Sequence, residues 1–198
     1  MTSLKTPIAK HMPKHFANKK YELACSEPYL WMRKAQEVRR AADVLWKQYR
    51  DEIVAFSNGE ESQGLFFGDV AVMLYGITVE NLLKAGLAAK GLAAAPNGNF
   101  GQKSHDLQSL AAAFGLVLSP QEAELLERLQ QFVEWAGRYP IPLYRESLYP
   151  RELLDGSKSA LYDLSTADGG HITNFLHKIE ALLPTEGEAI QSYANSSA

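Results

Sequence analysis

Cysteine and long apolar runs are both scarce in this chain of 198 residues, and each shortage excludes a class of protein. The single Cys25 cannot form an intramolecular disulfide, which excludes a small disulfide-rich scaffold. No stretch of about 18 uninterrupted apolar residues occurs, and no charged-then-apolar leader opens the chain. We therefore expect a cytoplasmic protein that has no membrane partner.

A strong net charge is lacking as well. Twenty Lys and Arg against 23 Asp and Glu give a formal charge of -3, so any site for a polyanion must be a local patch. The sequence contains no convincing strand, fixed-period repeat or glycine-rich phosphate loop. With 46% hydrophobic residues, the chain is long enough for one substantial core.

The most apolar segment is residues 66–91, which predicts a helix with two apolar stripes. A helix covered on more than half its circumference requires at least three others around it, so this segment is expected to be the central helix of a bundle. The first stripe holds Val72, Tyr75, Val79, Leu83 and Gly86, and the second holds Met73, Ile77, Glu80, Lys84 and Leu87.

Four further helices are predicted from apolar periodicity and from capping signals. Residues 28–56 carry an apolar face, and residues 168–183 carry another before Pro184. A short helix is expected to begin with Ser104 as its N-cap and to end at Gly115. Ser119, Pro120 and Glu122 form a capping-box signal for a long helix that ends near residue 136. The apolar face of 28–56 comprises Val38, Ala42, Leu45, Tyr49, Ile53 and Phe56, and that of 168–183 includes Leu182 and Leu183.

These elements predict an all-α, up-and-down bundle of four to five helices with a short extra helix and irregular termini. Residues 1–27 are expected to be a basic mobile arm, 28–184 the bundle domain and 185–198 a disordered tail. Residues 141–164 are expected to be a loop with one short helix near 157–164.

Several polar groupings are better explained by solvent exposure than by function. Arg33, Arg40, Lys47 and Arg50 follow one side of the 28–56 helix, where a solvated face is favoured over a phosphate track. His11 and His15 have the spacing of helical metal ligands, but Pro13 lies between them. His171 and His177 point to different faces of one helix. No metal site and no cofactor are expected.

Three short motifs occur in an order that is typical of one family. Each is common alone, since Glu-x-x-x-Lys is an ordinary i,i+4 ion pair. In this order, before a terminal apolar helix, they make residues 66–183 resemble a HEPN domain, with 28–56 as the first helix. The motifs are Val79-Glu80-Asn81-Leu82-Leu83-Lys84, Ser104-His105-Asp106-Leu107 and Arg138-Tyr139-Pro140.

The resemblance implies an all-α bundle, often a homodimer, that acts in a toxin–antitoxin or defence system with a small nucleotidyltransferase as partner. Active HEPN proteins cleave RNA without a metal through an R-x4-6-H motif at the dimer seam, where arginine stabilises the phosphate and histidine transfers a proton. Arg138 stands where this arginine is expected, but the permitted downstream positions hold Leu143, Tyr144 and Arg145. A tyrosine, whose ordinary pKa is about 10, replaces that histidine poorly near neutral pH.

The candidate ligand- or phosphate-binding residues are therefore Arg138, Tyr144, Arg145 and His105. For Arg138, capping of the preceding helix end is as good an explanation, and for His105 local hydrogen bonds are favoured. Glu80 and Lys84 are expected to form a structural ion pair.

The absent histidine favours a non-catalytic module that binds RNA, a nucleotide or a protein partner. The alternatives are a divergent metal-independent endoribonuclease and a structural oligomer subunit. The loop after Arg138 is rich in tyrosine, leucine and isoleucine, so it is expected to cover a groove or a homodimer seam.

Overall fold

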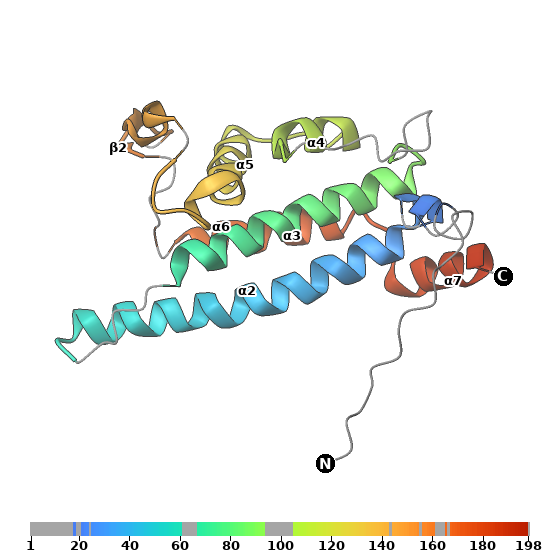
Figure 1. The fold of residues 1–198 in the computed structure, drawn as a ribbon, viewed down its shortest axis with the longest axis horizontal. Coiled ribbons are helices and arrows are strands. Elements are labelled where there is room, and N and C mark those ends of the chain that lie inside the picture. Colours follow the sequence, from blue (N-terminus) through green and yellow to red (C-terminus); the bar gives the residue numbers. More distant parts are fainter. Residues whose placement is uncertain are drawn as a thin grey trace, which may run out of the picture.

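The structure, a computed structural model, is an all-α helical bundle over the residues that it describes, as predicted (Figure 1). Those residues are 18, 21–23, 25–60, 67–93, 105–142, 144–154, 156–160, 165 and 167–197. The α-helices are α2 (Pro28–Ser57), α3 (Gly68–Ala89), α4 (Leu107–Phe114), α5 (Pro120–Gln131), α6 (Asp168–Glu180) and α7 (Glu186–Ser197). The shorter elements are the π-helix η1 (Phe132–Ala136), the 3-10 helix η2 (Arg145–Leu148) and the antiparallel strands β1 (Arg151–Glu152) and β2 (Lys158–Ser159).

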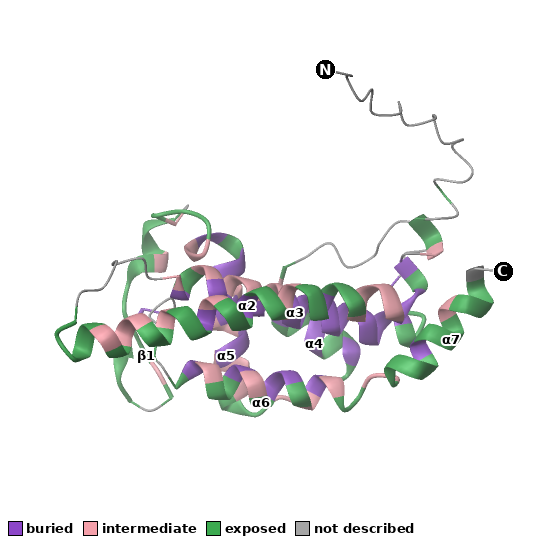
Figure 2. Cartoon of the chain, turned by 90° about the horizontal axis from the view of Figure 1, so that it is seen from below, coloured by how far each residue is buried: buried purple, intermediate pink, exposed green. Residues whose placement is uncertain are grey.

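Helix α3 is the centre of the bundle, which confirms the two-stripe prediction. It contacts α2, α4, α5, η1 and α6, and the buried residues concentrate along it (Figure 2). Val79 and Leu83 have no exposed surface. Helix α3 is long and apolar enough to span a membrane, but 78% of its most apolar 18-residue window is buried within the bundle. This burial is typical of the core helix of a soluble protein.

Helix α2 lies along α3 but extends beyond the start of α3 into solvent (Figure 1). The expected burial of Phe56 is therefore wrong, because this residue lies in the last turn of α2 and is 67% exposed. The residues of α2 that are buried instead include Ala35, Ala42 and Trp46. The cations Arg33, Arg40, Lys47 and Arg50 are all exposed on α2.

Side chains close in sequence cap the starts of α5 and α4. Ser119 accepts a hydrogen bond from the Glu122 backbone and Glu122 accepts one from the Ser119 backbone, which confirms the predicted capping box. At α4 the N-cap is Asp106, so the prediction of Ser104 as the N-cap is wrong, and Ser104 itself lies outside the described residues. Gly115 ends α4 with a φ of 80°.

Three expectations for the second half of the chain are wrong. Residues 158–159 form a strand rather than a helix, because 151–159 turn back on themselves as a hairpin through Gly156, whose φ is 79°. Helix α6 ends at Glu180, and Leu182 is consequently 57% exposed. Most of the tail expected to be disordered is helix α7.

Helix α7 is stabilised at its start and on one face. Thr185 and Glu188 exchange hydrogen bonds of 2.8 and 3.3 Å between side chain and backbone, which is a second capping box. The helix packs against α2, buries Ala189 and places the ring of Tyr193 5.5 Å from that of Tyr29.

At the other terminus, residues 1–17 of the expected basic arm, with His11 and His15, lie outside the described residues. Cys25 and Glu27 are buried, so the folded part of the chain begins before Pro28.

Candidate functional site

Glu80, Lys84 and His105 form one polar cluster, although the sequence predicts the first two and the third separately. Lys84 Nζ donates a hydrogen bond to Glu80 Oε1, and Nδ1 of His105 lies 2.9 Å from Glu80 Oε2. The Glu80 and Lys84 side chains are 8% and 10% exposed, while His105 is 55% exposed. The structural ion pair is therefore present as predicted, and it is buried.

The local sequence explains how the cluster is presented. Glu80 and Lys84 are one turn apart on α3, so their side chains leave the same face of the helix. Asp106 caps α4 through a 2.9 Å hydrogen bond from the backbone N–H of Ser109 and a 2.6 Å bond from its hydroxyl. These hydrogen bonds lower the pKa of Asp106. The cap fixes the chain just before α4, which places His105 against α3.

The carboxylate determines what the imidazole can do. Because an ionised carboxylate only accepts hydrogen bonds, Nδ1 of His105 is the donor and Nε2 is the ring nitrogen that does not contact Glu80. The cluster also contacts α2, because Lys84 Nζ lies 5.6 Å from the centre of the Trp31 ring. The cluster therefore links α2, α3 and the start of α4.

Arg138 lies at the end of η1, where it serves as a helix cap. Its guanidinium donates to the backbone carbonyl of Glu134 and lies 5.5 Å from the centre of the Tyr139 ring. The capping alternative for Arg138 thus describes its contacts in the structure.

The structure does not bring Arg138 next to His105. His105 contacts Glu80, whereas Arg138 contacts the Glu134 carbonyl and the Tyr139 ring, and no hydrogen bond or ion pair joins Arg138 to His105 in the described part of the chain. Arg138, Tyr144 and Arg145 are all exposed and lie in one segment of the chain. Leu143 lies outside the described residues.

That segment projects from one end of the bundle beside α5 (Figure 1). It does not fold onto the core as the groove-covering expectation would require, because its large apolar side chains face solvent. They are Tyr139, Ile141, Tyr144, Leu148, Tyr149 and Leu154, with exposed fractions of 38% to 69%.

Two ion pairs that the sequence does not predict join α5 to α6. Arg128 binds Asp168 through two bonds of 2.7 and 2.9 Å, and Lys178 binds Glu122 at 2.7 Å. The partners are 40 and 56 residues apart, so no local spacing signals them. Among the described residues, no group of three or more His, Cys, Asp or Glu side chains is placed to hold a metal ion.

The fold and these residues define a helical bundle with a buried ion-pair cluster and an exposed aromatic segment. No protein-family model matches the chain, and neither the curated proteins nor the solved structures include a significant match to it.

Proposed function

We propose that this protein is a non-catalytic, HEPN-like helical bundle that binds a protein partner through residues 138–154. The observation that carries the proposal is the exposure of six large apolar side chains in this one segment. Together they expose on the order of 600 Å², which is as large as the largest apolar patch of a typical monomer. A standard interface buries about 800 Å² on each partner, so the segment supplies most of one.

The composition of the segment also favours a protein partner. Tyrosine and arginine are enriched in protein interfaces and dominate their binding energy. Charges of both signs stand beside the apolar residues, with Arg145 next to Glu146 and Arg151 next to Glu152. The resemblance to HEPN domains implies that the partner is a second copy of the chain or a small nucleotidyltransferase.

RNA is less well supported as the ligand of this segment. Affinity for nucleic acid comes mainly from cations that neutralise phosphates. Arg138 is engaged by the Glu134 carbonyl and Arg151 by the Glu127 carboxylate. Arg145 is the one arginine of the segment whose side chain makes no hydrogen bond or ion pair in the described part of the chain.

The test compares two sets of exposed apolar residues. The double variant Ile141→Ser and Tyr144→Ser removes the two most exposed of the six side chains, while Val117→Ser removes an apolar side chain that is 84% exposed elsewhere. Light scattering at micromolar concentration would measure the mass of the chain alone and mixed with the protein encoded by the neighbouring gene. We expect a complex that the double variant loses and Val117→Ser keeps. A wild-type chain that stays monomeric both alone and in the mixture would contradict the proposal.

A second candidate, a divergent metal-independent endoribonuclease, is favoured by one observation. Glu80 holds Nδ1 of His105, which is the arrangement that directs Nε2 of an imidazole toward a substrate proton. A nuclease also needs a cation to bind the phosphate. The two cations considered for this role are already engaged, because Lys84 is paired with Glu80 and Arg138 caps a helix.

A further inference from the structure

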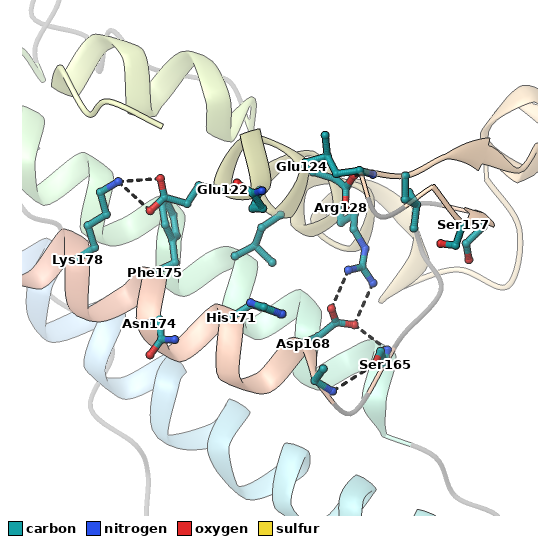
Figure 3. A pocket seen from close by; sticks show the side chains of 16 residues that line it. Glu122, Glu124, Arg128, Ser157, Ser165, Asp168, His171, Asn174, Phe175 and Lys178 are labelled. Atoms are coloured by element: carbon teal, nitrogen blue, oxygen red, sulfur yellow. Dashed lines mark hydrogen bonds and ion pairs between the residues drawn. The ribbon is translucent and has the colours of Figure 1, made fainter. Parts of the chain in front are cut away.

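A cleft of about 650 Å³ lies between α5, α6 and the β1–β2 hairpin (Figure 3). Helices α5 and α6 run antiparallel along it, because Glu122 near the start of α5 pairs with Lys178 while Arg128 pairs with Asp168 at the start of α6. The two ion pairs stand at opposite ends of the cleft (Figure 3). The volume is within the range of sites that hold small organic ligands, about 300–1,000 Å³.

The cleft has an apolar lining from three elements. Leu125 of α5 and Phe175 of α6 are buried, and Leu153 and Leu154 come from the hairpin. An aromatic or aliphatic group of a ligand would gain about 25 cal/mol for each Å² that these side chains remove from water.

The charged residues at one end are fully occupied by each other. Arg128 makes two bonds to Asp168, and the backbone N–H of Ser165 donates a third to the same carboxylate at 2.7 Å. The Arg128–Asp168 pair itself therefore offers a ligand no unbalanced charge.

The charged residues at the other end of the cleft are also paired. Lys178 donates to Glu122 at 2.7 Å and to the backbone carbonyl of Val117 at 2.9 Å. Glu124, which lies beside Arg128 in Figure 3, accepts a 2.9 Å bond from the backbone N–H of Leu154. Counting both ends, three carboxylates line the cleft against the two cations Arg128 and Lys178, so an anionic ligand is disfavoured.

Three other polar side chains on the cleft are uncommitted. Gln121, His171 and Asn174 make no side-chain hydrogen bond within the part of the chain that the structure describes. His171 lies between the two ion pairs (Figure 3). Amide and imidazole groups both donate and accept, so they suit a ligand whose polar edge carries hydrogen-bonding groups.

We propose that this cleft is a binding site for a small molecule with a flat apolar body and a neutral or cationic polar group. The apolar lining holds the body, and His171, Asn174 and Gln121 bind the polar group. The cleft shares Leu153 and Leu154 with the partner-binding segment 138–154, but the side chains that bind the polar group lie on α5 and α6, and the cleft is separate from the Glu80 cluster.

The experiment uses three probes that share a phenyl ring and differ in charge: phenethylamine, 2-phenylethanol and phenylacetate. Backbone amide chemical shifts of the full chain would be followed during each titration. We expect shifts at Leu125 and Phe175 with millimolar dissociation constants for the amine and the alcohol, and at least about fivefold weaker binding of phenylacetate. Equal or tighter binding of phenylacetate, or no saturable shift with any probe, would overturn the proposal.

Two histidines of α6 provide matched variants. His171→Trp fills the cleft from an exposed position, and His177→Trp places the same side chain on the same helix outside the cleft. We expect His171→Trp to abolish the shifts and His177→Trp to retain them. Asn174→Trp, also exposed and in the cleft, repeats the test if His171→Trp is unstable. Probe binding that survives in the cleft-filling variants would refute the site.

Discussion

Nδ1 of His105 lies 2.9 Å from Oε2 of Glu80, across 25 residues of chain. Lys84 engages the other oxygen of the same carboxylate, so each Glu80 oxygen has its own N–H donor. A buried carboxylate is stable only when it is paired in this way. The contact therefore fixes the start of α4 to the central helix and makes Glu80 the member on which the cluster depends.

Replacing Glu80 should cost far more stability than replacing His105. Glu80→Gln leaves the buried ammonium of Lys84 without its carboxylate, a change that typically costs about 3–5 kcal/mol. His105→Ala removes one hydrogen bond at a half-exposed side chain and should cost about 1 kcal/mol. Urea denaturation followed by circular dichroism measures both free energies of unfolding.

The matched control removes both charges. The double variant Glu80→Met and Lys84→Met should lie within about 1–2 kcal/mol of the wild type or exceed it, because apolar side chains often replace a buried ion pair without loss. Equal costs for Glu80→Gln and His105→Ala would show that the ion pair is not the dominant interaction of the cluster.

The parts of this fold that the sequence predicts are those decided within a few residues of chain. The Ser119–Glu122 capping box spans four residues, and the two stripes of α3 repeat every three or four residues, so both signals are local. Helix α7 carried the same kind of signal at Thr185 and Glu188. The expectation of a disordered tail at 185–198 does not take this signal into account.

The rest depends on how helices dock. Nothing near Arg128 in the sequence indicates Asp168, which lies 40 residues away on α6. The contact of His105 with Glu80 likewise requires α4 to lie along α3. Phe56 fits the apolar period of α2, but its burial depends on where α3 begins. Such contacts are properties of the assembled bundle, and periodicity alone does not contain them.

Close helix packing at Gly76 gives a second prediction. A Cβ atom at this position would lie 2.5 Å from Cγ2 of Val133 and 3.1 Å from the backbone oxygen of Leu129. Gly76→Ala should therefore destabilise the protein by about 1–3 kcal/mol despite the better helix propensity of alanine.

Gly170→Ala is the matched substitution, since it lies in helix α6 with no heavy atom within 4 Å of the added Cβ. It should raise stability by up to about 1 kcal/mol. Thermal melts of the two variants should shift in opposite directions, and a melting temperature of Gly76→Ala at or above that of the wild type would disprove close packing of α3 against α5 and η1.

Acid should destabilise the fold partly through Glu122. Burial raises the pKa of this carboxyl, but hydrogen bonds from Lys178 and Ser119 lower it more, so the pKa lies below its ordinary value of 4.5. A carboxyl with a depressed pKa in the folded state stabilises the protein above its ordinary pKa, and this contribution is lost as the pH falls through the folded value.

Glu122→Gln retains a capping residue but lacks the ion pair with Lys178. It should lose up to about 1 kcal/mol at pH 7 and show a smaller fall in stability between pH 5 and pH 3 than the wild type. Urea denaturation at the three pH values measures this difference. Glu186→Gln, at an exposed position in α7, is the control. An identical fall for wild type and Glu122→Gln would exclude a contribution from Glu122.

The last prediction concerns RNA cleavage and the role of Arg138. A guanidinium has a pKa above 12, so it binds phosphate but cannot act as a general base at neutral pH. We expect no more than trace cleavage of a generic RNA in EDTA by the wild-type chain. Robust cleavage that is abolished by His105→Ala or Arg138→Ala would favour the nuclease and overturn the non-catalytic proposal.

Arg138 should instead matter for the end of η1 and for the segment that follows. Removing its bond to the Glu134 carbonyl in Arg138→Ala should lower the melting temperature by about 2–4 °C, the shift expected for roughly 1 kcal/mol in a chain of this size. Because the same guanidinium lies against the Tyr139 ring, the variant should also weaken partner association more than Arg33→Ala on exposed α2. If Arg138→Ala lowers only the melting temperature and leaves partner association intact, Arg138 is a helix cap and has no part in binding.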